Sequence, residues 1–298
     1  MPERHKAKVL VTGASGMLGL ALRAQLAAPY EVVGVSKTGR LETQACDLSD
    51  ERQVRQLFLS VKPDWVVHSA AYSDVDGCEQ NPELAFSANA LSTKYLAAAC
   101  SVSGAPLIYV STDYVFDGRK REPYTENDLT GPVNVYGMTK LAGESYAKAC
   151  VAPSATVRTS WLFGDGNPNT FVSAILKRLK SEKRISVLED QQDSPTFTKD
   201  LAQAIGTIGA KLLSEKKSGH RVFQICNRGV ATRHSMTLKM KEWLALPVQV
   251  DKTDKSQIPH RFAIRPAYGV MSTRAYEEFS GERLRPWEEA LREYVSTI

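Results

Sequence analysis

The segment VLVTGASGMLG near the N-terminus constrains the fold of this 298-residue chain more than any other feature. Its glycines stand between an apolar run, Lys8 to Thr12, and an amphipathic stretch, Met17 to Ala28. A strand that enters a helix through such a turn brings backbone N–H groups close to a pyrophosphate at the helix N-terminus. The pattern therefore predicts a dinucleotide-binding domain. The turn residues expected at the cofactor are Gly13, Ser15, Gly16, Met17, Leu18 and Gly19.

Strand-like and helix-like segments alternate through the first half of the chain. The strand-like runs are Lys8 to Thr12, Glu31 to Val35, Trp65 to His68, Leu107 to Ser111 and Ala155 to Arg158. The helical patterns between them are Met17 to Ala28, Glu51 to Val61, Pro82 to Ser103 and Val135 to Ala149. Such alternation predicts an α/β fold with a Rossmann-type, doubly wound parallel sheet. We expect a nucleotide domain over residues 1–160 and a smaller substrate-binding domain over 161–298, with Val222 to Cys226 returning to the main sheet.

Composition narrows the class of partner. The net charge of +5 is spread along the chain, which suits an anionic small ligand and argues against nucleic acid. The five cysteines form no CxxC pair and the histidines form no ligand pattern, so we expect reduced thiols and no metal. No apolar run is long enough for a membrane span, and the N-terminus lacks the apolar core of a signal peptide. These features predict a cytoplasmic protein that binds no membrane.

Tyr136 and Lys140 form the candidate catalytic pair. They stand four residues apart in a predicted helix, so both side chains project from one face. A free tyrosine has a pKa near ~10, and a neighbouring ammonium is expected to lower it and to hold the cofactor ribose. Thr112 ends a predicted strand, where open α/β sheets place their ligands, and its hydroxyl can orient a substrate oxygen. We therefore predict catalytic roles for Thr112, Tyr136 and Lys140 in nicotinamide-dependent redox chemistry.

The glycine spacing GxxGxxG resembles the extended branch of the short-chain dehydrogenase/reductase superfamily. An enzyme that prefers NAD usually carries an acidic residue after the second strand, but here Lys37 and Arg40 follow it and could pair with a 2′-phosphate. We therefore expect NADPH as the cofactor, with NADH as the second choice. By the resemblance, Asp47 and Leu48 contact adenine.

Longer motifs indicate a particular family. The segments AAYSDVDGCEQNP, STDYVFDG, PVNVYGMTKLAGE, RTSWLFGDGNPNTF, EDQQDSPT and RPAYGVMST resemble the dTDP-4-dehydrorhamnose reductase family. The resemblance implies reduction of the 4-keto group of a nucleotide-activated deoxysugar, dTDP-4-dehydrorhamnose to dTDP-rhamnose, with Tyr136 as the proton donor. It also implies that Ala70, Ala71 and Tyr72 line the cofactor. The substrate contacts it implies are Val75, Asp76, Thr112, Asp113, Trp161 and Asn169.

Two other functions remain open. Nucleotide-sugar dehydratases carry Asp-Glu after the threonine, whereas Asp113 and Tyr114 stand there in this chain, and epimerases typically lack the run from Asp113 to Phe116. A non-catalytic NADP-binding role is the second alternative, because the regulatory β subunit of methionine adenosyltransferase resembles this family and keeps the Tyr–Lys pair. The chain also departs from the reductase pattern at Asp193, where glycine is usual, and at Tyr268-Gly269-Val270, where a serine is displaced. A homodimer is the one protein partner that the resemblance suggests.

Overall fold

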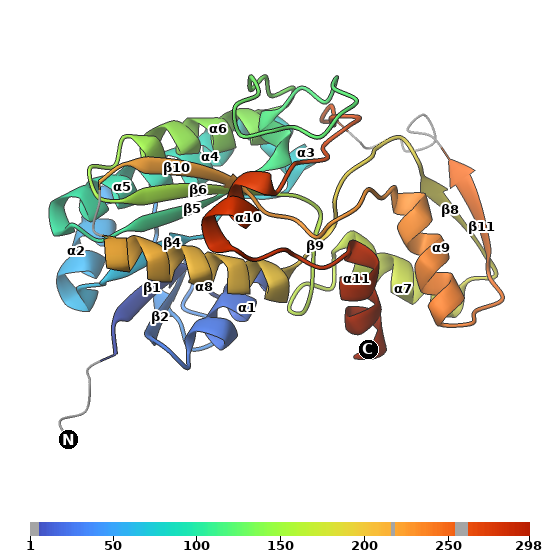
Figure 1. Cartoon of the computed structure of the whole chain (residues 1–298), viewed down its shortest axis with the longest axis horizontal. Helices are drawn as coiled ribbons and strands as arrows, with labels where there is room; N and C mark the ends of the chain where they lie inside the picture. The colour runs from blue at the N-terminus through green and yellow to red at the C-terminus, as the bar shows by residue number, and fades with distance from the viewer. Residues whose placement is uncertain (1–5, 216–217, 254–261) are drawn as a thin grey trace.

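A seven-stranded parallel sheet forms the centre of the molecule (Figure 1). This computed structural model describes residues 6–215, 218–253 and 262–298. The strands run in the order β3-β2-β1-β4-β5-β6-β10, which is the order of the dinucleotide-binding fold and confirms the predicted class. They are β1 (Lys8–Thr12), β2 (Glu31–Ser36), β3 (Gln44–Ala45), β4 (Trp65–His68), β5 (Leu107–Thr112), β6 (Ser154–Thr159) and β10 (His220–Gln224).

Helices cover both faces of this sheet. One face packs on α1 and α8, which also pack on each other, and the other face packs on α2, α5 and α6. Figure 1 shows these as layers above and below the strands. Because both faces are covered, the central strands read as continuous apolar runs, and β4 and β5 are buried at every residue. The helices of the chain as described are α1 (Met17–Leu26), α2 (Glu51–Val61), α3 (Val75–Gln80), α4 (Pro82–Phe86), α5 (Ser92–Ser103), α6 (Val135–Lys148), α7 (Phe171–Ser181), α8 (Thr198–Glu215), α9 (Arg233–Trp243), α10 (Arg274–Ser280) and α11 (Trp287–Ser296).

The expected helix from Pro82 to Ser103 contains a π-helical turn over Ser87–Leu91, between α4 and α5. This turn directs Asn89 inward, where its side chain accepts from the backbone N–H of Tyr72 at 2.7 Å and donates to the Tyr72 carbonyl at 3.1 Å. The same amide group donates to Thr139 of α6 at 3.0 Å. The irregular turn thus fixes the loop that follows β4.

The part of the chain after residue 160 contributes to two cores. Helix α8 and strand β10 complete the layers around the main sheet, whereas α7, α9 and α11 enclose a second apolar core. That core also includes β8 (Arg184–Leu188), which pairs in parallel with β11 (Gln249–Thr253), and the short pair β7 (Leu162–Phe163) and β9 (Thr196–Phe197). The division at residue 160 stays a prediction.

Among the described residues, no helix combines the length and apolar character that crossing a membrane requires.

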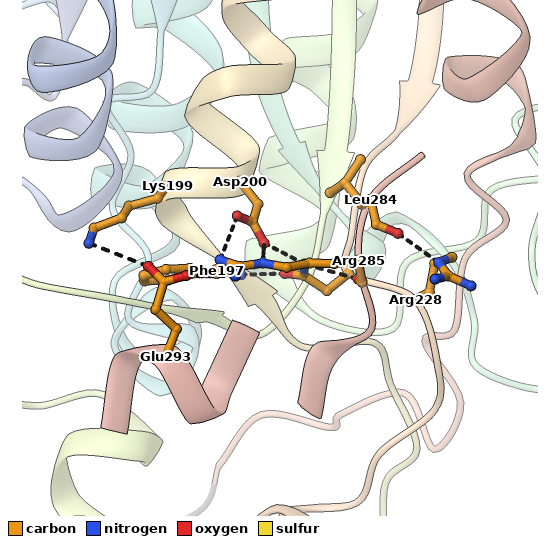
Figure 2. Close-up of polar contacts among 8 residues, drawn as sticks. Phe197, Lys199, Asp200, Arg228, Leu284, Arg285 and Glu293 are labelled. Atoms are coloured by element: carbon orange, nitrogen blue, oxygen red, sulfur yellow. Dashed lines mark hydrogen bonds and ion pairs between the residues drawn. The ribbon is translucent and has the colours of Figure 1, made fainter. Parts of the chain in front are cut away.

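A polar network ties the C-terminal segment to the start of α8 (Figure 2). The Arg285 guanidinium donates to both oxygens of Asp200 at 2.9 Å and to Glu293 at 2.6 Å, while Asp200 also accepts from Asn227. The Arg285 guanidinium lies over the Phe197 ring, 5.7 Å from its centroid. These contacts join the second core to the helix that covers the main sheet.

Candidate active site

The glycine turn has the backbone geometry that a dinucleotide phosphate site needs. Gly13 has a φ of +67°, and a Cβ there would lie 2.7 Å from the backbone nitrogen of Ala70. Gly16 donates to the Gly13 carbonyl at 2.9 Å and caps α1 without using a side chain. The first N–H groups of α1 therefore face open space rather than a side-chain cap, which suits a pyrophosphate.

One cavity of about 830 Å³ extends from this turn along the carboxyl ends of the strands. A volume of this size accommodates a dinucleotide fragment together with a second small ligand. The expected site residues that line it are Gly13, Ser15, Gly16, Met17, Leu18, Gly19, Lys37, Asp47, Leu48, Ala70, Ala71, Tyr72, Val75, Thr112, Asp113, Tyr136, Lys140 and Trp161. Arg40, Asp76 and Asn169 do not line it.

The adenosine end of the cavity lies beside Lys37, whose ammonium is 3.1 Å from the Asp47 carboxylate. Its side chain is 70% exposed, so it is free to turn toward a phosphate. A hydrogen bond from Ser49 chiefly lowers the pKa of Asp47, which keeps this carboxylate ionised. Arg40 is exposed in the turn behind Lys37, where its carbonyl accepts from Thr43 at 2.7 Å. Of the two predicted basic residues, only Lys37 reaches the cavity wall.

Tyr136 stands in the first turn of α6, which Asn134 caps by accepting from the Gly137 N–H at 2.8 Å. Burial and, next, the charge of Asp113 raise the pKa of Tyr136, and a hydrogen bond with Thr112 opposes the rise. Thr112 also accepts from the backbone of Tyr114 at 3.2 Å. Tyr136 and Thr112 therefore form a hydrogen-bonded pair on the cavity wall.

Lys140 lies one helical turn further along α6 and is 2% exposed. Its ammonium donates to the Val110 carbonyl at 2.7 Å and lies 4.2 Å from the centroid of the Tyr109 ring. Burial lowers the pKa of Lys140 to about 7, with Glu144 opposing the shift. The expectation that Lys140 lowers the pKa of Tyr136 is wrong for this structure, because burial and Asp113 dominate that phenol. Tyr136 consequently keeps its proton at neutral pH, as a proton donor must.

Glu144 and Arg158 support the catalytic strand from behind. The Arg158 guanidinium donates to both Glu144 oxygens, at 2.9 and 2.7 Å, and the Ser111 hydroxyl donates to Glu144 at 2.6 Å. Both charged side chains are less than a tenth exposed. Arg158 is thus a structural charge. Sequence reasoning missed Glu144, although its place four residues after Lys140 puts it on the same helix face.

His68 is a second buried polar group that the sequence did not single out. Its Nδ1 is 2.8 Å from the Thr12 hydroxyl and its Nε2 is 3.1 Å from Thr93. Burial, followed by the charge of Lys140, lowers the pKa of His68 to about 3. A neutral His68 therefore joins β1 to α5 beneath the cofactor turn without adding a charge beside Lys140.

The expected substrate residues divide into two groups. Trp161 lines the cavity in the left-handed backbone region, with a φ of +40°, and its ring lies 4.9 Å from the Arg233 guanidinium. Asp76 instead forms an ion pair with Arg265 and accepts from the Ala263 N–H at 2.9 Å, so its carboxylate fixes the C-terminal segment. Asn169 lies outside the cavity wall, which Asn167 reaches in its place.

The sheet order, the glycine turn and the buried Tyr–Lys pair together define the class of extended short-chain dehydrogenases/reductases. A family profile described as RmlD substrate binding domain matches residues 7–298, and the chain belongs to this family.

Relatives align over nearly the whole length. The spore coat polysaccharide biosynthesis protein SpsK of Bacillus subtilis is 38% identical, over 97% of this chain and 96% of that protein. The dTDP-4-dehydrorhamnose reductase of Mycolicibacterium smegmatis is 37% identical, over 98% of this chain and 86% of that protein.

Solved structures agree with this assignment. The dTDP-4-dehydrorhamnose reductase of Bacillus anthracis in complex with NADP superposes with a TM-score of 0.89 and 31% identity, covering 98% of this chain and 100% of that chain. The reductase from Clostridium acetobutylicum gives a TM-score of 0.87 and 34% identity, covering 97% of this chain and 99% of that chain. A UDP-galactose 4-epimerase at 21% identity and a TM-score of 0.81 shows the shared fold alone.

Proposed function

We propose that this protein reduces the 4-keto group of dTDP-4-dehydrorhamnose to give dTDP-rhamnose, with NADPH as the reductant. The observation that carries the proposal is the hydrogen-bonded pair of Thr112 and Tyr136 on the wall of a cavity that begins at the glycine turn. The full-length similarity to proteins named dTDP-4-dehydrorhamnose reductase supports the substrate. The similarity to a reductase solved with NADP, together with Lys37 at the adenosine end, supports the cofactor.

The chain's own residues perform the polar part of this reduction. When bound, NADPH supplies the hydride. Thr112 and Tyr136 both line the cavity, and the Thr112 hydroxyl donates to Asp113 at 2.9 Å. When a ketone oxygen lies between them, Thr112 can turn its O–H to donate to that oxygen while the oxygen receives the proton of Tyr136. Lys140 follows Tyr136 by one helical turn and also lines the cavity, where its amine group is proposed to hold the cofactor ribose. Val75, Asp113 and Trp161 lie on the same wall and are proposed to contact the sugar nucleotide.

The residue that follows Asp113 favours reduction over the related dehydration. Dehydration needs a second acid–base group to remove a proton from carbon. The position after Asp113 carries Tyr114, a buried phenol whose pKa burial raises to about 12, and whose ring packs edge-on against Tyr136 at 5.9 Å. Such a group is a poor base at neutral pH, whereas the glutamate of the dehydratase pattern would be ionised.

Oxidation of NADPH, followed by absorbance, tests the proposal with dTDP-4-dehydrorhamnose and a panel of other 4-keto sugar nucleotides. We expect Tyr136→Phe to lower kcat by at least ~100-fold, because general acid catalysis contributes about that much or more, while NADPH still binds. Tyr146→Phe is the matched control, since Tyr146 is on α6 but does not line the cavity, and its activity should equal that of the wild type.

Two outcomes would contradict the proposal. An unchanged rate in Tyr136→Phe would remove Tyr136 as the proton donor. NADPH binding without turnover of any keto-sugar nucleotide, together with copurification of a synthetase, would identify a regulatory NADP-binding subunit instead. A cytoplasmic location and a homodimer complete the proposal, and light scattering of the purified protein tests the second.

A further inference from the structure

Two aspartates lie together behind the catalytic threonine. Asp113 follows β5 directly, and Asp193 lies far along the chain, where its backbone exchanges hydrogen bonds with Ala231 at 3.0 and 2.8 Å. Each aspartate is 2% exposed. With both carboxyls ionised, Asp113 Oδ2 has no hydrogen-bond donor within the described ranges 6–215, 218–253 and 262–298. A buried acceptor in this state is costly, so a proton between the two carboxyls is the simplest way to satisfy it.

Gly269 shows how closely the carboxyls approach. A Cβ at this position would lie 2.5 Å from Asp193 Oδ2 and 2.8 Å from Asp113 Oδ2, so both oxygens converge on one point above the glycine. Asp193 and the segment Tyr268-Gly269-Val270 are the two places where the sequence departs from the reductase pattern. These two departures are in contact in the structure. The Asp193 carboxylate occupies the space that a side chain at position 269 would need.

The surroundings favour a single shared proton. Burial, then the charge of Asp193, raises the pKa of Asp113 well above its usual range, and burial raises the pKa of Asp193 to about 6. The hydrogen bond between them places the proton on Asp113, with Asp193 as the acceptor. The titratable and charged groups that face the pair are Tyr114, Tyr136, Cys226, Arg233 and Tyr268. Of these groups only Arg233 is cationic. Its charge can compensate one ionised carboxylate in the pair but not two.

The pair is connected to the proton donor. The Thr112 hydroxyl donates to Asp113 Oδ1 at 2.9 Å, and Thr112 is hydrogen-bonded to Tyr136. We propose that Asp113 and Asp193 hold one proton between them and return it to Tyr136 through the Thr112 hydroxyl after each reduction. Asp193 is then a positioning residue, since it holds the proton on Asp113 and does not line the cavity. This proposal rests on the proposed reductase function.

The transfer balances in protons and charge. After Tyr136 gives its proton to the alkoxide, Thr112 turns its O–H toward the phenolate and transfers its proton. The shared proton lies on Asp113 Oδ2, whereas Thr112 contacts Oδ1, so the Asp113 carboxyl first turns its O–H toward Thr112. This O–H bond then breaks as a new O–H bond forms on the Thr112 oxygen. The pair is then one proton short, a state that the charge of Arg233 does not match. Because Asp113 lines the cavity, it takes up a proton from water, which returns the pair to one negative charge.

The shared proton is tested without any turnover, by urea unfolding of the wild type and Asp193→Asn between pH 5.5 and 7.5. A carboxyl whose pKa is higher in the folded state binds its proton more tightly there, so the unfolding constant rises with pH, by up to about tenfold per pH unit for one proton. Lys140 and the buried histidines act on this slope equally in both proteins, so the difference between the two slopes reports the aspartate pair. We expect the unfolding constant of the wild type to rise more steeply with pH than that of Asp193→Asn. Asp193→Gly, which removes the group entirely, should behave like Asp193→Asn.

The control for this measurement is Asp128→Asn. The pKa of Asp128 is lowered to about 2, chiefly by its hydrogen bond from Lys120, so its removal leaves the slope over this pH range unchanged. Equal slopes in the wild type and both Asp193 variants would overturn the shared proton.

Steady-state NADPH oxidation tests the relay. We expect Asp193→Asn to lower kcat about tenfold with KM within about twofold, and to lose the fall in kcat that the wild type shows as the pair deprotonates at high pH. Unchanged kcat and pH profile would overturn the relay. A wild type that oxidises no NADPH with any keto-sugar nucleotide would overturn the proposed function and the relay with it, while the unfolding slopes would still decide the shared proton.

Discussion

Removing the Glu144 carboxylate is expected to destabilise the protein strongly, because it leaves the Arg158 charge without its partner. The pair is bidentate, with N–O distances of 2.9 and 2.7 Å, and both side chains are less than a tenth exposed. Arg158 is also held over the Phe116 ring, 5.1 Å from its centroid, and so has little freedom to reach water. Glu144→Leu keeps most of the side-chain volume and removes only the charge and its hydrogen bonds.

The magnitude follows from the burial of the pair. Breaking a buried ion pair by removing one partner costs about 3–5 kcal/mol. The Ser111 hydroxyl loses its acceptor as well, which places the loss toward the upper part of that range. For 298 residues the unfolding entropy near the midpoint is roughly 0.6 kcal/mol per kelvin, so a loss of about 4 kcal/mol lowers Tm by about 6–7 °C.

Thermal unfolding followed by circular dichroism measures this effect. Glu51→Ala is the control, since its pair with Arg55 is exposed and should change stability by less than about 0.5 kcal/mol. Glu144→Leu combined with Arg158→Met should recover much of the loss, because no unpaired charge remains buried. A decrease in Tm of less than about 2 °C for Glu144→Leu alone would refute the reasoning, as it would mean that water solvates Arg158.

Two further predictions concern lysines of the cavity. Lys37→Ala should lower the preference for NADPH over NADH about tenfold, the equivalent of one charge-assisted phosphate contact. Fluorescence titration with both cofactors measures this preference, and Lys94→Ala on the outer surface of α5 is the control. An unchanged ratio of the two affinities would rule out a contact between Lys37 and the 2′-phosphate. Lys140→Met should raise the stability of the cofactor-free protein at neutral pH. Since burial lowers the pKa of Lys140 to about 7, the unfolded state binds the extra proton, so the destabilisation that Lys140 causes in the wild type decreases as pH rises. The advantage of the variant should therefore shrink by about 2–3 kcal/mol between pH 6.5 and 9 in urea unfolding, and a constant difference would contradict the shift.

Local sequence patterns were sufficient for the sheet and for the cofactor end of the site. The glycine turn, the apolar strands and the helix carrying Tyr136 and Lys140 are each defined by residues a few positions apart. The rule of right-handed crossovers limits the possible topologies, but the order of the strands comes from the structure. The π-helical turn before α5 was not foreseen, because the amphipathic pattern continues through it and its purpose, holding the Tyr72 loop with Asn89, is tertiary.

The spacing of Tyr136 and Lys140 predicted which residues share a helix face, but it did not predict the direction in which the pKa of Tyr136 shifts. The four-residue spacing places Tyr136 and Lys140 on one helix face, and from this an effect of the ammonium on the phenol was expected. Burial lowers the pKa of Lys140, and burial together with Asp113 raises the pKa of Tyr136. Both effects arise from elements that pack against this helix face, not from the helix itself. Desolvation is a property of the assembled core, and no short motif encodes it.

The sequence by itself determined the class of fold, the glycine turn and the identity of the hydroxyl and amine groups that face the cofactor cavity, because each depends on periodicity or spacing within one or two elements. Only the tertiary structure decided which distant side chains meet. It paired Asp76 with Arg265, which removes Asp76 from the cavity wall, and it placed Asp193 against Asp113 below Gly269. These contacts join segments whose separation along the chain carries no information about their distance in space, and that distance is set by how helices and loops pack onto the finished sheet.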